Sequence, residues 1–185
     1  MSVLPIFTYG SSVLRKKGRP VVEVSDELVK LVMDMFDTMR NANGIGLAAT
    51  QVGSLCRVVV IDLTDLEGTK EVRPITLINP EVISTEGKWT MEEGCLSIPD
   101  VRADVERPET VRIRFKNAHF ADVELEATGI VGRVILHEID HLDGVLFIDH
   151  LATAQKKLHL KDLKKIQRGE IEVDYPVITA ARVSV

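Results

Sequence analysis

Residues 129–142, GIVGRVILHEIDHL, constrain the fold of this chain more than any other stretch. Their pattern predicts a helix that Gly144 ends, and apolar side chains occur on more than one side of it. A helix of this kind belongs inside a core, because a surface helix keeps a broad polar face toward water. We therefore expect the other elements of the chain to surround it.

The remaining segments predict both helices and strands. An amphipathic N-terminal helix is expected over residues 25–44, and a charged C-terminal helix over residues 153–169. Apolar runs predict strands at 56–62, two short strands bent at Pro80 within 74–85, and a β-hairpin at 110–126. The order of these elements predicts an α+β fold, with antiparallel β-sheets packed around the central helix.

Length and charge limit the class of protein. The chain of 185 residues predicts a single domain over residues 1–169, followed by a C-terminal tail over residues 170–185. A net charge of -5 argues against DNA as a partner. No apolar run approaches the ~20 residues of a membrane span, and the start, MSVLPIFTYG, has no signal-peptide pattern. Its two cysteines are too few for a disulfide framework, and an intracellular location would keep them reduced. We expect a cytoplasmic protein that is a monomer.

Two histidines and a glutamate on the central helix predict a metal site. His137 and His141 are four residues apart, so their side chains lie on one face of a helix and can bind the same ion. Glu138, beside the first, can reach a water molecule there without being a ligand. Zinc hydrolases use this arrangement with the glutamate as general base. The alternative interpretation is a pair of half-buried structural histidines.

The usual third ligands of such a helix are missing here. In the extended metalloprotease pattern a third histidine would stand at the position of Phe147. The nearest downstream glutamates, Glu170 and Glu172, lie in a polar stretch beyond the last predicted helix. His150 follows an apolar, strand-like run and is a poor candidate. The third ligand must therefore be sought upstream.

Cys95, in the stretch MEEGCLSIPD, is the best upstream candidate. Packing does not require a thiol at this position, and a thiolate is a strong ligand for a borderline ion. Cys95, His137 and His141 would form a site with one coordination position open for water. That is the form of a catalytic site, because a structural site is closed by a fourth protein ligand.

Three stretches, in this order, resemble the signature motifs of the peptide deformylase family. They are GIGLAATQ, EGCLS and HEIDHLDG, within residues 44–144. The family removes the formyl group from the N-terminal formyl-methionine of new bacterial polypeptides. The resemblance therefore implies formyl-methionyl nascent peptides as the substrate and one divalent metal ion as the cofactor. The ion is characteristically Fe²⁺, and Zn²⁺, Ni²⁺ or Co²⁺ can also occupy the site.

The resemblance also implies roles for the residues at the metal. Cys95, His137 and His141 are the implied ligands, and Glu138 is the implied general acid and base. Chemistry agrees with a need for that base, because a divalent ion lowers the pKa of a bound water only to roughly 7 in favourable sites. A thiolate ligand makes the ion less acidic than three imidazoles would.

Substrate contacts follow from the same motifs. Gln51 and the backbone N–H of Leu96 are implied donors to the formyl oxygen, and Gly46 is implied to present its backbone to the substrate. We expect an apolar wall for the methionine side chain, formed by Ile45, Leu47 and Val134. The alternative interpretation of these three residues is ordinary core.

Two residues depart from the family pattern. Thr50 stands where proline is usual before the glutamine, and Leu136 stands where a glutamine commonly precedes the first histidine. Near the cysteine motif we also expect an ion pair between Glu93 and Arg102. The C-terminal helix is rich in lysine, and some deformylases have a basic helix there that approaches the ribosome. This helix is otherwise a solvated face.

Two other functions remain as rivals. The helix with two histidines alone would suit a zinc endopeptidase, against which Phe147 and Cys95 argue. A binding module with a structural metal would need a fourth protein ligand, and it would have no use for Glu138 or Gln51.

Overall fold

The computed structural model describes residues 2–66, 68 and 73–183. The helices of this part are α1 (Asp26–Asn41), α2 (Gly129–Leu142), α3 (Thr153–Leu158), α4 (Leu160–Arg168) and α5 (Ala180–Val183). Its strands are β1 (Ile6–Phe7), β2 (Gly46–Ala48), β3 (Val58–Ile61), β4 (Ile75–Glu86), β5 (Trp89–Cys95), β6 (Ile98–Arg107), β7 (Thr110–Lys116), β8 (Asp122–Thr128) and β9 (Val177–Ile178). Helices and antiparallel sheets occur together, which confirms the predicted α+β class.

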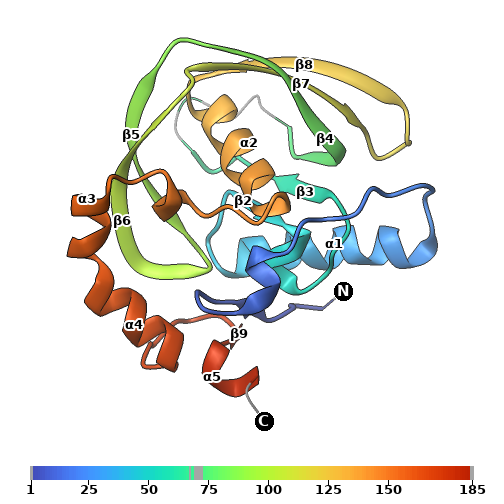
Figure 1. Cartoon of the computed structure of the whole chain (residues 1–185). Coiled ribbons are helices and arrows are strands. Elements are labelled where there is room, and N and C mark those ends of the chain that lie inside the picture. Colours follow the sequence, from blue (N-terminus) through green and yellow to red (C-terminus); the bar gives the residue numbers. More distant parts are fainter. Residues whose placement is uncertain (1, 67, 69–72, 184–185) are drawn as a thin grey trace.

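Helix α2 lies at the centre of the molecule, as its sequence predicted (Figure 1). An antiparallel sheet in the order β2-β3-β4-β7-β8 covers it, and the hairpin of β5 and β6 runs along one side. Buried side chains of α2 pack against this sheet in one core cluster, which includes Val59, Leu77, Ile113, Ile135 and Leu142. Ten of the helix's residues are buried, so packing contacts surround it on nearly every side.

Two further clusters complete the core. Helix α1 packs Met35 and Met39 against Leu47 and Val58 on the opposite side of β2 and β3. Ser25 caps this helix by accepting a hydrogen bond from the N–H of Leu28 at 3.2 Å. Strand β6 packs against the segment after α2 and against α4 in the third cluster.

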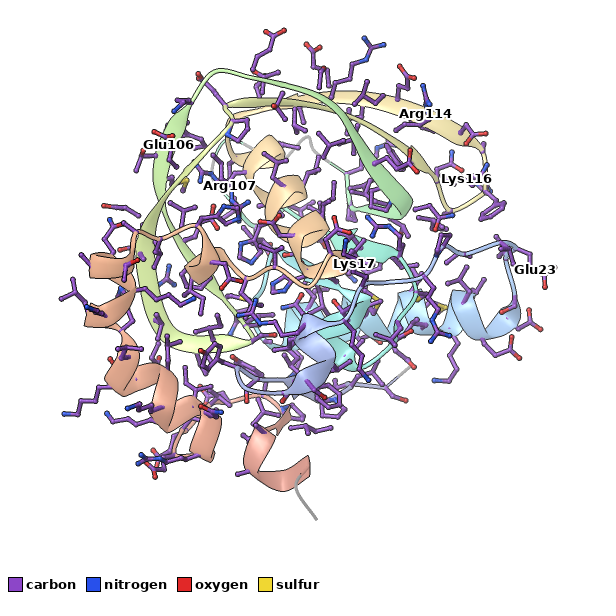
Figure 2. All side chains as sticks on the ribbon, in the orientation of Figure 1. Lys17, Glu23, Glu106, Arg107, Arg114 and Lys116 are labelled. Carbon is purple, nitrogen blue, oxygen red and sulfur yellow. The ribbon has the colours of Figure 1, made fainter. Side chains whose placement is uncertain are left out.

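The predicted hairpin is formed by β7 and β8. Its outer face carries ion pairs across the strands, which join Arg112 and Arg114 to Glu124 and Lys116 to Asp122. Figure 2 shows Arg114 and Lys116 on this outer face, whereas Arg107 points inward beside α2.

The prediction of two short strands within 74–85 was wrong, because β4 continues through Pro80 as one strand. Its register with β7 shifts between Ile78 and Glu81, which is a β-bulge. Asn79 adopts a φ of 52° there, and its side chain bonds the N–H and the carbonyl of Val21 at 2.8 and 2.7 Å. The bulge absorbs the bend, so the strand does not end.

The prediction of one continuous C-terminal helix was also wrong. The helix breaks at His159 into α3 and α4. Helix α3 has no buried residue, whereas α4 turns Leu163 and Ile166 into the core. A change of direction at His159 is what allows α4 to bury these two side chains. After Gly169 the chain runs back across the molecule, and β9 pairs in parallel with β1.

In the part of the chain that the structure describes, none of the helices is both long and apolar enough to span a membrane.

Candidate metal centre

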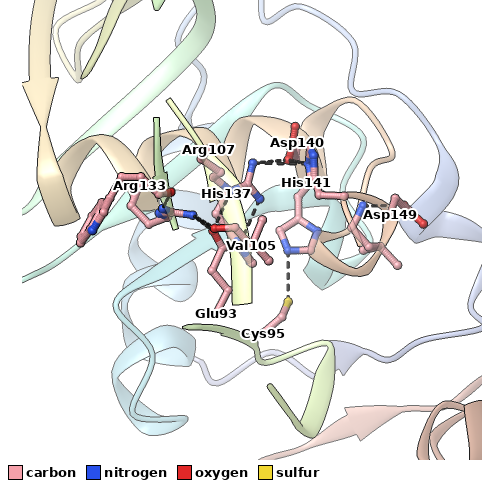
Figure 3. A network of polar contacts seen from close by, with 12 residues as sticks. Glu93, Cys95, Val105, Arg107, Arg133, His137, Asp140, His141 and Asp149 are labelled. Atoms are coloured by element: carbon pink, nitrogen blue, oxygen red, sulfur yellow. Dashed lines mark hydrogen bonds and ion pairs between the residues drawn. The ribbon is translucent and has the colours of Figure 1, made fainter. Parts of the chain in front are cut away.

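Helix α2 and the end of β5 bring three possible metal ligands together. His137 and His141 lie one turn apart on α2, and Cys95 is the last residue of β5. One ligand atom from each lies within 4.8 Å of the other two. The Cys95 Sγ is 3.2 Å from the Nε2 of His141 (Figure 3). Both histidines are buried and the cysteine is half-buried, so the donors converge below the surface.

The surroundings of the three donors fit a divalent ion. His137 is bonded through Nδ1 to Glu93 at 2.9 Å, which leaves its Nε2 for the site. Burial lowers the pKa of His141, which favours the neutral ring that binds metals. One thiolate and two imidazoles suit a borderline ion, and three protein donors leave a coordination position open.

Glu93 is the centre of a buried ionic network around this site (Figure 3). Its carboxylate accepts hydrogen bonds from Arg107 Nε at 2.7 Å and from Arg133 Nη1 at 2.8 Å, besides its contact with His137. Burial disfavours the charged carboxylate, but the bonds from His137 and Arg107 hold its pKa well below the usual value. Glu93 therefore orients a metal-site histidine while it neutralises two buried arginines.

The predicted ion pair between Glu93 and Arg102 was wrong. Arg102 is exposed, and its Nη1 lies 3.7 Å from Oε1 of Glu92. Strand geometry explains the difference, since successive side chains point to opposite faces. Glu93 is paired in register with Ala103, on the same face as Arg107, whereas Arg102 points to the opposite face with Glu92. The correct partner of Glu93 could have been found from the sequence only if the register of β5 and β6 had been known.

The network continues away from the site. Arg107 Nη1 donates to Asp140 Oδ2 at 2.6 Å, and His150 Nε2 lies 2.7 Å from the same oxygen. His150 is therefore held by a carboxylate outside the three donors, in agreement with its rejection as a ligand. The ring of Phe147, at the position of the missing third histidine, stacks beside His137 at 6.2 Å between centroids.

Glu138 lies next to the donors with an oxygen that has no partner. It is buried, and its Oε2 has no hydrogen bond to any described residue. Burial raises the pKa of this carboxyl to about 7. A buried carboxyl oxygen without a partner lowers the stability of the fold, so packing does not explain Glu138. A carboxyl with a pKa near neutrality can both accept and donate a proton.

Gly46 on β2 passes close to this carboxyl. A Cβ at Gly46 would lie 2.6 Å from Glu138 Oε1 and 2.9 Å from a methyl of Val134, so larger residues do not fit. The glycine thus keeps a strip of backbone open beside Glu138, as expected for a close backbone approach.

Gln51 and Leu96 lie next to Cys95. Gln51 Oε1 accepts from the N–H of Ala48 at 2.8 Å, which turns Nε2 toward Ser97 Oγ at 3.2 Å and Cys95 Sγ at 3.6 Å. Leu96 is the first residue of the turn between β5 and β6. Both predicted donors therefore lie beside the cysteine.

The two departures from the family pattern have different surroundings. Thr50 is fully buried, and its hydroxyl donates to the carbonyl of His141 at 3.0 Å, so it ties the Gln51 segment to the end of α2. Leu136 is buried in the cluster between α2 and the sheet. Its side chain contributes to packing.

A cleft of about 880 Å³ opens onto Cys95, His137 and Glu138. Ile45, Gly46, Gln51 and Val134 line it. Leu47 does not, and its prediction as a substrate contact was wrong. Leu47 is fully buried against α1, because it alternates with Gly46 along β2 and points to the opposite face.

The C-terminal segment 172–175 also lines the cleft, which sequence reasoning missed. Tyr175 reaches the turn after Cys95 and donates its hydroxyl proton to the carbonyl of Leu96 at 2.8 Å. Only a contact across 79 positions of the chain reveals this neighbour, and no local pattern points to it.

Comparisons with known proteins agree on one family. The family model described as polypeptide deformylase matches residues 3–157. The chain is 45% identical to a peptide deformylase of Chlorobium phaeobacteroides, over 95% of both proteins. It is 46% identical to one of Salinibacter ruber, over 96% of this chain and 95% of the relative.

Solved structures point the same way. A peptide deformylase from Legionella pneumophila aligns with a TM-score of 0.83 and 34% identity, covering 91% of this chain and 98% of its own. One from Synechococcus elongatus, in complex with actinonin, aligns with a TM-score of 0.79 and 38% identity, over 96% of this chain and 94% of its own.

Proposed function

This chain belongs to the polypeptide deformylase family, and on that premise we propose that the cleft at Cys95, His137 and His141 is its active site. The enzyme is a metal-dependent hydrolase that removes the N-formyl group from nascent peptides. It hydrolyses a formamide bond and releases formate and a free N-terminus. The observation that carries the site assignment is the meeting of three metal donors beside a buried carboxyl oxygen without a partner.

In the proposed mechanism, Cys95, His137 and His141 would hold a divalent ion, which would supply Lewis acidity when bound. Glu138 takes a proton from the attacking water while the water oxygen forms a bond to the formyl carbon. As the carbon–nitrogen bond breaks, Glu138 delivers that proton to the leaving amine. The burial of Glu138 supports both roles, because it raises the pKa of the carboxyl to about 7.

Gln51 and Leu96 are proposed to stabilise the charge that develops on the formyl oxygen. The side-chain N–H of Gln51 and the main-chain N–H of Leu96 would donate to this oxygen. Each such donor is typically worth about 10²–10³ in kcat when it is held in place beforehand. The proximity of Gln51 Nε2 to Cys95 Sγ, at 3.6 Å, supports this role.

The methionine specificity is assigned to the wall of the cleft. Ile45 and Val134 would contact the unbranched side chain of the substrate methionine, while Gly46 would leave room for its backbone. The apolar character of this wall and the close approach of Gly46 to Glu138 support the assignment.

Fe²⁺ is the ion we propose for this enzyme, with Zn²⁺, Ni²⁺ or Co²⁺ as possible occupants. We also propose that it works in the cytoplasm as a monomer, where nascent peptides are made. Residues 1–169 would be the catalytic domain, and the tail, residues 170–185, would add segment 172–175 to the wall of its cleft.

Formate release from formyl-Met-Ala-Ser tests the proposed function. We expect release by freshly prepared ferrous protein, little release after removal of the metal, and recovery when Fe²⁺ is returned. Acetyl-Met-Ala-Ser and an unformylated longer peptide serve as controls. Cleavage of an internal peptide bond would instead support the endopeptidase, and metal-loaded protein that releases no formate would support a structural metal.

We propose in addition that α3 and α4 contact the ribosome. Lys157, Lys161 and Lys164 are exposed there, beside Leu158, whose surface is 78% exposed. A basic surface with an exposed apolar residue suits an RNA-rich partner, against the net charge of -5 of the whole chain.

Charge reversal tests the ribosome contact better than truncation does, because truncation after Leu151 would remove Leu163 and Ile166 from the core. Lys157, Lys161 and Lys164 changed together to Glu should lose most co-sedimentation with ribosomes. The same change at Lys16, Lys17 and Arg19, which are also exposed, is the charge-matched control. Equal co-sedimentation of both variants would rule the contact out.

A further inference from the structure

The turn that carries Leu96 is held by both ends of the chain. Cys95 is paired with Ile98 across β5 and β6, so Leu96 and Ser97 alone form the turn. The Tyr175 hydroxyl donates to the carbonyl of Leu96 at 2.8 Å. The main-chain N–H of Tyr9 donates to the carbonyl of Ser97, also at 2.8 Å. Both outward carbonyls of the turn therefore have a donor.

The pairing of β1 with β9 places these two donors. Tyr175 lies two residues before β9, and Tyr9 lies two residues after β1. The strands are parallel and in register from Ile6 with Val177 to Phe7 with Ile178. Hydrogen bonds from Ile6 N to Pro176 O at 2.9 Å and from Thr8 N to Ile178 O at 3.0 Å continue the pairing on both sides. The first and last strands thus form one unit that faces the turn.

The position of Leu96 depends on few contacts. Among the described residues, the Tyr175 hydroxyl is the hydrogen-bond donor that the structure assigns to the Leu96 carbonyl. The side chain of Leu96 sits against Gly44, where a Cβ would lie only 2.7 Å from it. Side chain and carbonyl are therefore fixed from two directions, which leaves the adjacent N–H of Leu96 little freedom to turn.

We propose that the β1–β9 pair is a clamp that sets the direction of the Leu96 N–H, with Tyr175 as its positioning residue. The proposal rests on the role of Leu96 in the proposed function. A donor stabilises a developing oxyanion best when it needs no reorientation during the reaction. The Leu96 N–H belongs to the Cys95–Leu96 peptide, so the hydroxyl acts on it through the backbone torsions of Leu96, which the bond to the Leu96 carbonyl restricts. Without the hydroxyl these torsions would be less restricted, and the N–H would have to reorient during each turnover. Burial raises the pKa of Tyr175 to about 12, so its hydroxyl keeps its proton throughout the physiological range.

Tyr175→Phe removes the hydroxyl and keeps the ring. We expect kcat for formyl-Met-Ala-Ser to fall by about 10- to 100-fold, which is less than the loss of a whole oxyanion donor. KM should stay within about twofold, and metal content and Tm should match the parent protein. Hydrogen exchange of the peptide that covers residues 95–98 should become faster. Thr8→Val is the matched control, since it removes a hydroxyl 3.5 Å from the Ile178 carbonyl in the same strand pair without touching the turn.

Each outcome decides the proposal. A kcat of Tyr175→Phe equal to the parent's would overturn it, as would a fall in kcat accompanied by lost metal or a lower Tm, because Tyr175 would then be a packing residue. Equal losses in Thr8→Val would also count against it. If the parent protein releases no formate, the proposed function itself fails, and faster exchange at residues 95–98 in Tyr175→Phe alone would still show that the clamp exists.

Discussion

Replacing Glu138 by Gln is expected to lower kcat for formate release by about 10²–10⁴-fold, the usual contribution of a general acid and base. The variant keeps the shape of the side chain but can neither take a proton from water nor give one to the amine. Stability should not fall with activity, because the carboxyl is buried and its Oε2 has no partner among the described residues. A Tm equal to or above that of the parent is the expected companion result.

Steady-state kinetics, metal analysis and thermal unfolding check this prediction together. Asp143→Asn is a matched control at the C-cap of the same helix, where the carboxylate pairs with Arg57 and lies outside the cleft. Its kcat should remain within about twofold. Full activity in Glu138→Gln with bound metal would remove Glu138 from the mechanism.

The second large effect is expected at Glu93. Glu93→Gln leaves Arg107 and Arg133 buried without their shared carboxylate, and removal of one partner from a buried ion pair typically costs about 3–5 kcal/mol. It also loosens His137, whose Nδ1 contacts Glu93 at 2.9 Å. Loss of such an outer contact commonly weakens metal binding by about 10–100-fold.

Urea unfolding of the metal-free protein and competition with a chelator measure the two effects separately. Glu92→Gln is the control, since this neighbour is exposed and lies 3.7 Å from Arg102, where an ion pair contributes only about 0–1 kcal/mol. If both variants unfold at the same urea concentration, the buried network does not stabilise the fold.

The features that could be predicted from the sequence are those set by local spacing. The central position of α2 follows from apolar residues on several sides, and the shared face of His137 and His141 follows from helix geometry. Gly46 was recognised as a place of close backbone approach. The α+β class needed only the order of the elements.

What could not be predicted depends on register and on distant contacts. The partner of Glu93 is decided by which face of β5 it occupies. Arg107 and the wrong choice, Arg102, are five residues apart along β6, and this odd separation places them on opposite faces. Leu47 was misplaced because the alternation along β2 sends it to α1. The bulge at Asn79 and the break at His159 result from tertiary packing. Tyr175 reaches the cleft only because β9 pairs with β1.

The pairing of β1 with β9 has a consequence for the order of events during synthesis. Ile6 and Phe7 are made long before their partners, Val177 and Ile178. Contacts so distant in sequence form late, because the closure of a long loop costs entropy before the contact is gained. A chain still growing on the ribosome can form α1 and much of the central sheet. The turn that carries Leu96 then still lacks its contact with Tyr175. We expect full catalytic competence only after residue 178 has emerged.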